Sequence, residues 1–448
     1  MVKEEGQRRA RSPIEVTVPE MLRLAIPSMI FAGLTNGYRL VDQYWLQDVS
    51  TEAQAAIGSS VFVLILYYAL FVLIASGASP IVARAVGAGD DGLLRRVLGA
   101  ALGGAGAVTV VLSLAGGLGA GWIAQVLGLS GDTALACETY IQVLSWTVLP
   151  LVLTPFVDQS FIAMGDARMP MTLHAVSLLL NIVLTPLLIV EAGLGVAGAA
   201  LASNGSRAVT TGIGLWILLR RARPGWSDLA AMDELRRIVR VGTPVAVGVA
   251  MYTLVYWAML NISISPLGPQ VNAALGIGFS VLEGGMAFPC FNGISMATAS
   301  FVGRALGAGQ PEDARRAVRL ALPLSTGLGI FFSAVFLFAG GPLADIFTDD
   351  PVVLEGAVGY ATVLAFSQLF VAWETLCDGA LNGSGATRTS FWISAPLNTL
   401  RVPLSWAFAF PLGMGAIGVW WAINLTTYAK TGLKAWFVWR GDWTQTKV

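Results

Sequence analysis

Twelve apolar stretches, each long enough to cross a bilayer, dominate this chain of 448 residues. A transmembrane helix needs about 20 mostly apolar residues. Only 12% of the residues are charged, against roughly 25% in a soluble domain. The stretches lie at 20–46, 54–78, 97–121, 134–161, 170–191, 194–219, 241–264, 271–299, 317–340, 353–381, 388–411 and 414–438. They are too long and too uniformly apolar for alternating barrel strands, so we expect an all-α membrane protein with twelve transmembrane helices.

The charge balance and the short motifs exclude several classes of protein. Twenty-seven Lys and Arg residues balance 27 Asp and Glu residues, so no basic field would attract nucleic acid. The three cysteines, Cys137, Cys290 and Cys377, have no zinc-ligand spacing and are odd in number. GLGVAG from Gly193 and GMGAIG from Gly413 fit the dinucleotide pattern, but each opens a membrane helix instead of following a strand. With no Walker or hydrolase motif, we expect no enzyme activity, no catalytic residues and no cofactor.

Arginine is confined to alternate loops, which predicts the orientation of the chain in the membrane. The loops after the second, fourth, sixth, eighth and tenth stretches contain arginine, including Arg95, Arg168 and Arg388. The loops between them contain no Lys or Arg and carry acids such as Asp132 and Asp349. Because basic loops stay in the cytoplasm, both termini are expected on that side.

The two halves of the sequence repeat each other at a spacing of 220 residues. ARAVGAGDD from Ala83 matches GRALGAGQP from Gly303. Further pairs at this spacing are Arg84 and Arg304, Gly87 and Gly307, Asp158 and Asp378, Gly165 and Gly385, and Gly198 and Gly418. Each half holds an even number of stretches, so we expect two parallel six-helix bundles, the plan of a transporter. The predicted parts are an N-terminal tail at 1–18, an N-lobe at 19–219, a linker at 220–240, a C-lobe at 241–440 and a C-terminal tail at 441–448.

Five acids lie inside the predicted spans, namely Asp42, Asp158, Glu283, Glu374 and Asp378. A charge there costs about 2.5–3.5 kcal/mol and is seldom kept without a use. We interpret Glu283 and Glu374 as groups that bind the coupling ion or the substrate. Asp378 lies one helical turn after Glu374 and shares its face, although its place near the cytoplasmic end of the span, like that of Asp158, also suits a structural role.

Cations and aromatic residues inside the spans leave several interpretations open. Asp42 could form an ion site or be neutralised by Arg39, three residues earlier. His174 could relay protons or be simply hydrogen-bonded, and Lys430 and Lys434 are expected to extend to the cytoplasmic surface. Aromatic faces can hold organic cations or pack in a core. The candidates for a substrate cavity are Tyr67, Tyr256, Trp373, Arg39 and Arg401.

Several short strings follow one another in a specific order. They are LAIPSM around Pro27, VDQYW around Asp42, AAIG at Ala55, ARAVGAGD and GRALGAG in the two repeated loops, LNIVLTP, GVAGAALAS and GALNGSGATR. In these strings and their spacing the chain resembles the multidrug and toxic compound extrusion (MATE) transporters over nearly its full length. The resemblance implies a monomeric twelve-helix antiporter in the lipids of a bacterial or archaeal plasma (inner) membrane. It would export lipophilic, often cationic organic compounds in exchange for H⁺ or Na⁺ by alternating access of two lobes, with Pro27 as a candidate hinge.

The resemblance assigns the site residues unevenly. Asp42 and Asn181 match polar positions of an N-lobe cation site, and Ser203 replaces a threonine there, but Thr185 stands where many members have an aspartate. Thr253 likewise occupies a position where one branch has an essential glutamate.

In the C-lobe the resemblance is to another branch of the family. Glu283 and Glu374 resemble its glutamates in the eighth and tenth helices. Two such carboxylates could exchange protons or, with other oxygen atoms, hold Na⁺. The alternative is a flippase or exporter of a lipid-linked or other anionic metabolite in the same superfamily, which Arg39, Arg207 and Arg401 would favour.

Overall fold

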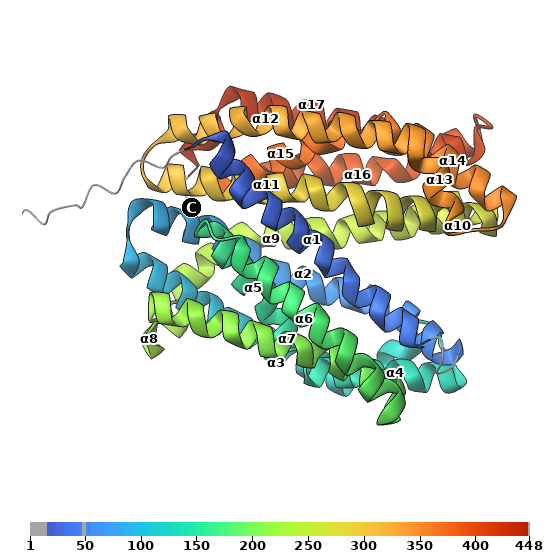
Figure 1. Ribbon diagram of the computed structural model, residues 1–448, viewed down its shortest axis with the longest axis horizontal. Helices are drawn as coiled ribbons and strands as arrows, with labels where there is room; N and C mark the ends of the chain where they lie inside the picture. Colours follow the sequence, from blue (N-terminus) through green and yellow to red (C-terminus); the bar gives the residue numbers. More distant parts are fainter. Residues whose placement is uncertain (1–15, 47–50, 447–448) are drawn as a thin grey trace, which may run out of the picture.

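The computed structural model describes residues 16–46 and 51–446, which are helical almost throughout and contain no β-strand. Figure 1 shows two bundles of helices. The first, the N-lobe, consists of α1 (Val18–Leu46), α2 (Thr51–Ala88), α3 (Asp91–Val126), α4 (Gly131–Trp146), α5 (Leu149–Ala163), α6 (Arg168–Pro186) with the π-helical turn η1 (Leu187–Glu191), and α7 (Gly195–Ala222). A single helical turn, α8 (Trp226–Leu229), lies in the segment between the bundles.

The second bundle, the C-lobe, has the same number of spanning segments but more interruptions. Its elements are α9 (Met232–Met259) with η2 (Leu260–Ile264) and η3 (Ser265–Leu267), α10 (Pro269–Ile277), η4 (Gly278–Ala287), α11 (Phe288–Gly307), α12 (Pro311–Ala334), η5 (Val335–Ala339), α13 (Gly340–Asp345), α14 (Pro351–Ala365), α15 (Gln368–Ser384), α16 (Thr387–Ala409), α17 (Gly415–Arg440) and η6 (Asp442–Gln445). The segments η2, η4 and η5 are π-helical and continue their α-helices.

The described helices account for all twelve predicted spans. Seven segments are long and apolar enough to cross a membrane by themselves. Two more spans are bent pairs, α4 with α5 at 55° and α14 with α15 at 58°. The remaining three, α7, α16 and α17, carry polar side chains such as Asn204, Arg401 and Lys434, which they bury inside the bundles. The prediction of twelve helices in two parallel six-helix bundles is therefore confirmed.

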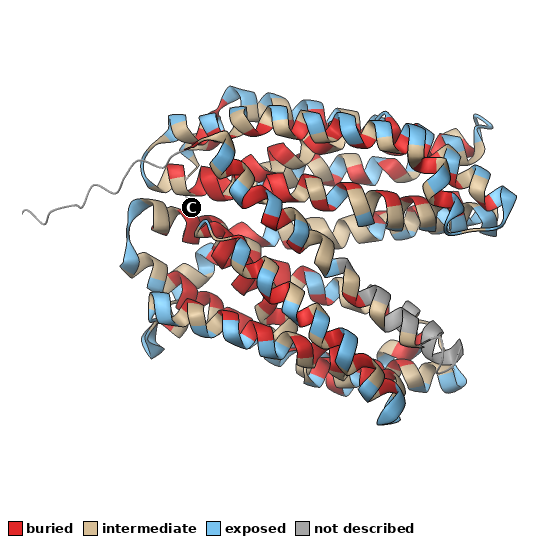
Figure 2. Cartoon of the chain, viewed as in Figure 1, coloured by how far each residue is buried: buried red, intermediate tan, exposed pale blue. Residues whose placement is uncertain are grey.

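The two lobes meet at one end of the molecule. In Figure 1 they converge where α8 and the C-terminus lie and diverge toward α4 and α10. The contacts between lobes are made mainly by α1 against α11 and by α2 against α9 and α11. Figure 2 shows buried residues inside each bundle and where the bundles meet. One buried cluster, which includes Met21, Ile162, Ala297 and Phe301, crosses this junction.

Two glycines of the repeat form reciprocal contacts at the converging end. A Cβ atom on Gly87 would lie 1.9 Å from the carbonyl oxygen of Arg304. A Cβ atom on Gly307 would lie 2.1 Å from the carbonyl oxygen of Arg84. Each glycine therefore touches the backbone of the other lobe at the residue that the repeat predicts. This is the arrangement expected of two parallel repeats related by an axis between them.

Candidate functional site

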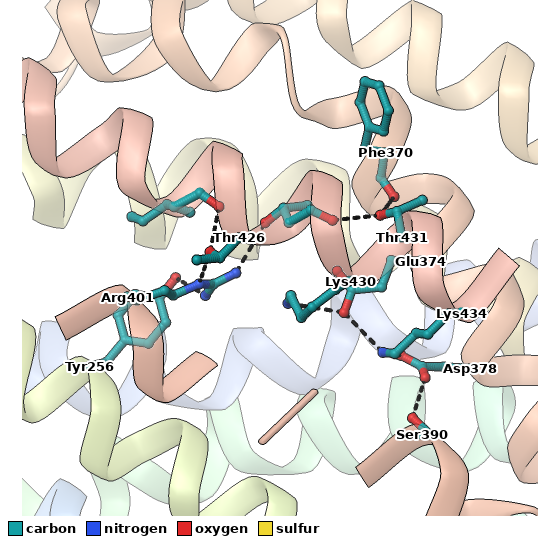
Figure 3. Close-up of polar contacts among 12 residues, drawn as sticks. Tyr256, Phe370, Glu374, Asp378, Ser390, Arg401, Thr426, Lys430, Thr431 and Lys434 are labelled. Atoms are coloured by element: carbon teal, nitrogen blue, oxygen red, sulfur yellow. Dashed lines mark hydrogen bonds and ion pairs between the residues drawn. The ribbon is translucent and has the colours of Figure 1, made fainter. Parts of the chain in front are cut away.

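Four charged side chains meet inside the C-lobe, and we call them the salt-bridge cluster: Glu374 and Asp378 from α15, and Lys430 and Lys434 from α17. Lys434 Nζ donates to Glu374 Oε1 at 2.9 Å and to Asp378 Oδ2 at 2.8 Å. Lys430 Nζ lies 3.0 Å from Glu374 Oε1. Asp378 also accepts a hydrogen bond from Ser390 of α16. Figure 3 shows these side chains pointing toward one another between the helices.

The cluster corrects the expectation that Lys430 and Lys434 extend to the cytoplasmic surface. Their residues are only 5% and 1% exposed, respectively. They lie one helical turn apart on α17, and Glu374 and Asp378 have the same spacing on α15, so two pairs of opposite charge face each other. Burying a lone charge is costly, whereas an ion pair offsets much of that cost. The acids of α15 therefore hold the lysines inside the bundle.

Glu283 has a different environment from the salt-bridge cluster. It lies in η4, a π-helical segment of ten residues, and its Oε2 accepts a hydrogen bond of 2.7 Å from the hydroxyl of Tyr360. It forms no ion pair with any residue in the described ranges. The side chain is half-buried, so this carboxylate is neither neutralised by a base nor sealed in the core.

Arg401 of α16 lies buried near the aromatic residues of the C-lobe. Its Nε and one terminal nitrogen donate to Thr426 and Thr427 at 2.9 and 3.0 Å, and the other donates to the hydroxyl of Tyr256 at 3.3 Å. All three are neutral oxygen atoms. Tyr256 in turn packs against Tyr252 at 4.6 Å and against Phe279 at 5.2 Å between ring centroids. A base and several aromatic groups therefore occupy one region of the C-lobe, which Phe279 connects to η4, the segment that carries Glu283.

The structure gives the two predicted glutamates different partners. Glu374 is bound by two ammonium groups, whereas Glu283 is bound by a phenol.

The residues predicted to line a substrate cavity are dispersed over the two lobes. Trp373 donates to Thr326 at 2.9 Å, and Tyr67 shares a hydrogen bond of 2.8 Å with Ser145 in the N-lobe. Among the candidates whose side chains the structure describes, only Tyr256 and Arg401 lie together.

The N-lobe positions suggested by the resemblance are largely uncharged. Asn181 donates to Ser203 at 3.4 Å, and both residues are buried together with Thr185. The side chains of Asp42 and Arg39 lie outside the part of the chain that the structure describes. Pro27 lies inside α1, which continues on both sides of it, and its role as a hinge stays a prediction.

A hydrogen bond between His174 and Asp158, a pairing that the sequence analysis did not predict, lies inside the N-lobe. His174 Nε2 of α6 is 2.9 Å from Asp158 Oδ2 of α5, and both are almost fully buried. Arg207 of α7 lies over the ring of Tyr38 at 3.9 Å. These four residues line a cavity of about 10 Å³, room for about one water molecule. The sequence does show an acid and a base on adjacent spans, which could have suggested this pairing. It does not show which faces of the two helices turn toward each other.

Comparisons with known proteins agree with this architecture. The family model MatE matches residues 27–187 and 244–407. A probable multidrug resistance protein NorM from Thermotoga maritima is 27% identical over 96% of this chain and 94% of the relative. An FAD transporter from Shewanella oneidensis is 25% identical over 77% of each chain.

Solved structures show the same fold. A multidrug resistance MATE family transporter in its outward-facing conformation superposes with a TM-score of 0.88, at 22% identity over 96% of this chain and 97% of that one. A transporter of the MOP superfamily from Pyrococcus furiosus, described as having a binding pocket of reverse polarity, matches with a TM-score of 0.88, at 21% identity over the same shares. With the family model matching both lobes, this chain belongs to the MATE family of multidrug efflux transporters.

Proposed function

We propose that this protein is a secondary active antiporter that exports lipophilic, often cationic organic compounds in exchange for protons. The two lobes would open alternately to either side of the membrane, and the C-lobe would carry the exchanging carboxylate. Family membership supports export. The placement of Glu283 supports the choice of group and of ion.

The observation that carries the proposal is the contrast between Glu283 and Glu374. Glu283 accepts a hydrogen bond from the neutral hydroxyl of Tyr360, so its charge is available to a proton or to an organic cation. Tyrosine rings nearby offer the faces to which organic cations bind. Glu374 already binds Lys430 and Lys434 at 3.0 and 2.9 Å, so a cationic substrate would have to displace an ammonium group. We therefore assign the exchange to Glu283 and a supporting role to Glu374.

The same contrast favours H⁺ over Na⁺. A sodium site shared by Glu283 and Glu374 would place the ion next to the ammonium groups of Lys430 and Lys434, which would repel it. The donor set around Glu374 does not fit a metal cation in this arrangement. A single carboxylate beside a phenol needs no further ligand to take up a proton.

The test is transport by the purified protein in proteoliposomes. Efflux of ethidium, a lipophilic cation, should follow an imposed pH gradient and not an imposed Na⁺ gradient. Glu283→Gln should abolish this efflux because an amide keeps the shape of the side chain but exchanges no proton. Glu355→Gln, which changes an exposed acid of α14, serves as the matched control. Efflux above half of the wild-type rate in Glu283→Gln would refute the assignment, and efflux driven by Na⁺ alone would refute the choice of ion.

A second candidate function, export of an organic anion, is favoured by Arg401. The residue is 3% exposed, and its guanidinium donates to three neutral oxygen atoms, so an anion entering the C-lobe would meet an available positive charge. The similarity to a relative named as an FAD transporter points the same way. Uptake of FAD into inverted vesicles that is lost in Arg401→Gln, without transport of ethidium, would favour this function over the first.

We also propose that both termini lie in the cytoplasm, with the lobes converging on that side. Arg84 and Arg304 lie at the converging end, as the alternation of basic loops predicts. Single cysteines at Ala230 and Val448, in a background without native cysteines, should react only from the cytoplasm. A cysteine at Asp349 should react only from outside. Labelling of any one of these cysteines from the opposite side would overturn the proposed orientation.

A further inference from the structure

A groove of about 780 Å³ runs along the outside of the C-lobe between α9 and α16. Its volume lies within the range of about 300–1,000 Å³ typical of ligand sites. Val239, Phe391 and Trp392 supply apolar walls, and Arg236, Arg240 and Arg388 supply guanidinium groups. The groove faces away from the interior, since Trp392 is 70% exposed. It is therefore separate from the salt-bridge cluster and from Glu283.

Helical spacing explains why these side chains form one surface. The residues that α9 contributes recur every three or four positions, which places them on one face of the helix. Arg388, Phe391 and Trp392 lie within one turn of α16. Both helices begin at this end of the bundle, so the arginines gather there. The apolar part of the groove extends from them along α9 as far as Val247.

The acids of this region are already engaged with other arginines. Asp233 lies 3.4 Å from Arg236, and Glu234 accepts a hydrogen bond of 2.8 Å from Arg96 of the N-lobe. Within the described ranges, Arg240 and Arg388 form no ion pair. The head of the groove therefore carries two guanidinium groups without counter-charges, next to an apolar channel.

We propose that this groove is a binding site for an anionic phospholipid. The lipid phosphate would sit between Arg240 and Arg388, because guanidinium groups form strong paired hydrogen bonds with phosphate oxygens. An acyl chain would follow the apolar walls past Val239 and Phe391. A basic head and an apolar channel on the membrane-facing surface match the two ends of such a lipid and no water-soluble anion. Basic pockets between transmembrane helices are known to bind anionic head groups.

The position of the groove gives the bound lipid a structural consequence. α9 packs against α2 of the N-lobe and against α16 of the C-lobe. A lipid held between α9 and α16 would therefore brace the helix that connects the two lobes. Because the lipid binds only the folded protein, its binding also stabilises the fold by mass action.

The experiment is native mass spectrometry of the delipidated full-length protein, titrated with phosphatidylglycerol or with phosphatidylcholine of the same acyl chains. The wild type should bind one phosphatidylglycerol more tightly than any phosphatidylcholine. Removing both charges in Arg240→Gln/Arg388→Gln should weaken this binding about 30-fold, from the contribution of each basic residue near a lipid head group. Arg23→Gln/Arg168→Gln removes two exposed arginines from the N-lobe and should bind like the wild type.

A second measurement locates the acyl chain without changing the arginines. Trp392 should be quenched by phosphatidylglycerol carrying bromine on its acyl chains, so Trp392→Phe should reduce the lipid-dependent part of the fluorescence quenching. Equal quenching in this variant would overturn the position of the lipid. Equal affinity of the wild type for the two lipids, or unchanged affinity in the double arginine variant, would overturn the site itself.

Discussion

The interiors of the two lobes are built on the same helix pairs but carry different chemistry. The repeat places Thr154 at the position of Glu374, Thr210 at that of Lys430 and Gly214 at that of Lys434. In the N-lobe, Thr154 shares a hydrogen bond of 2.7 Å with Thr211, where the C-lobe has its salt-bridge cluster.

Space accounts for part of this difference. A Cβ atom on Gly214 would lie 2.7 Å from the side chain of Leu173 and 2.9 Å from that of Val157, so a larger residue at this position of the N-lobe would have to displace both. At these three positions the scaffold carries neutral residues in the N-lobe and charged side chains in the C-lobe, whereas the acid at Asp158 and Asp378 is common to both lobes.

The framework itself is shared between the lobes. Asn204 and Asn424 are repeat equivalents, and both are buried. Asn204 donates to the carbonyl of Leu144 at 3.3 Å, and Asn424 donates to the carbonyl of Val363 at 2.6 Å. Each asparagine thus links the last helix of its lobe, α7 or α17, to the bent span of that lobe by a hydrogen bond to a backbone carbonyl. The repeat therefore conserves how the helices are joined and the buried acid at Asp158 and Asp378, while the partner of that acid differs: it is His174 of α6 in the N-lobe and Lys434 of α17 in the C-lobe.

The largest loss of stability is expected from Lys434→Met, which removes a charge that only the C-lobe carries. Removing the ammonium leaves Asp378 without a basic partner and Glu374 with only Lys430, and breaking a buried ion pair costs about 3–5 kcal/mol. Thermal unfolding of the purified protein should show a large loss of stability. Adding Glu374→Gln and Asp378→Asn to Lys434→Met should recover most of it, because a neutral interior carries no unpaired charge. A stable single variant would mean that the cluster contributes little.

The two equivalent asparagines, which make the same kind of hydrogen bond in each lobe, should contribute equally to stability. Asn204→Ala and Asn424→Ala each remove a buried donor from a backbone carbonyl, which costs about 1–3 kcal/mol. The two variants should lose similar amounts of thermal stability. A loss confined to one of them would show that the shared framework is important in only one lobe.

The smallest effect is expected at the neutral pair of the N-lobe. Thr154→Val removes one hydroxyl from the contact with Thr211 and should cost about 1 kcal/mol. Thermal unfolding measures this loss, and transport of ethidium should remain near the wild-type rate. Loss of transport in Thr154→Val would contradict the assignment of proton exchange to the C-lobe.

The spans and the repeat were predictable from the sequence because both depend on long, regular patterns. Twelve apolar stretches give the helices, and the spacing of 220 residues by itself pairs positions such as Asp158 and Asp378. The partners of those acids were not predictable. Asp158 meets His174 and Asp378 meets Lys434, and these contacts depend on how each helix is rotated.

General rules for single residues also failed in particular places. Lysines near helix ends usually extend to the membrane surface, and only the facing acids of α15 reverse that expectation for Lys434. No sequence pattern marked the π-helical segment around Glu283, because its geometry depends on packing within the bundle. A rule for a single residue predicts the position of its side chain only where no contact with a neighbouring helix changes that position.

The reciprocal contacts of Gly87 and Gly307 bear on the energetics of the proposed alternation of access between the two lobes. Each glycine rests on a backbone carbonyl of the opposite lobe at the converging end. Since the two contacts are related by one axis, rocking the lobes apart breaks both together, and an intermediate that keeps only one gains little. In the proposed alternation of access the change would therefore be cooperative, and these two residues would help to set its equilibrium constant. A methyl group at either position would then shift the population of the two proposed states toward the one in which this end is open.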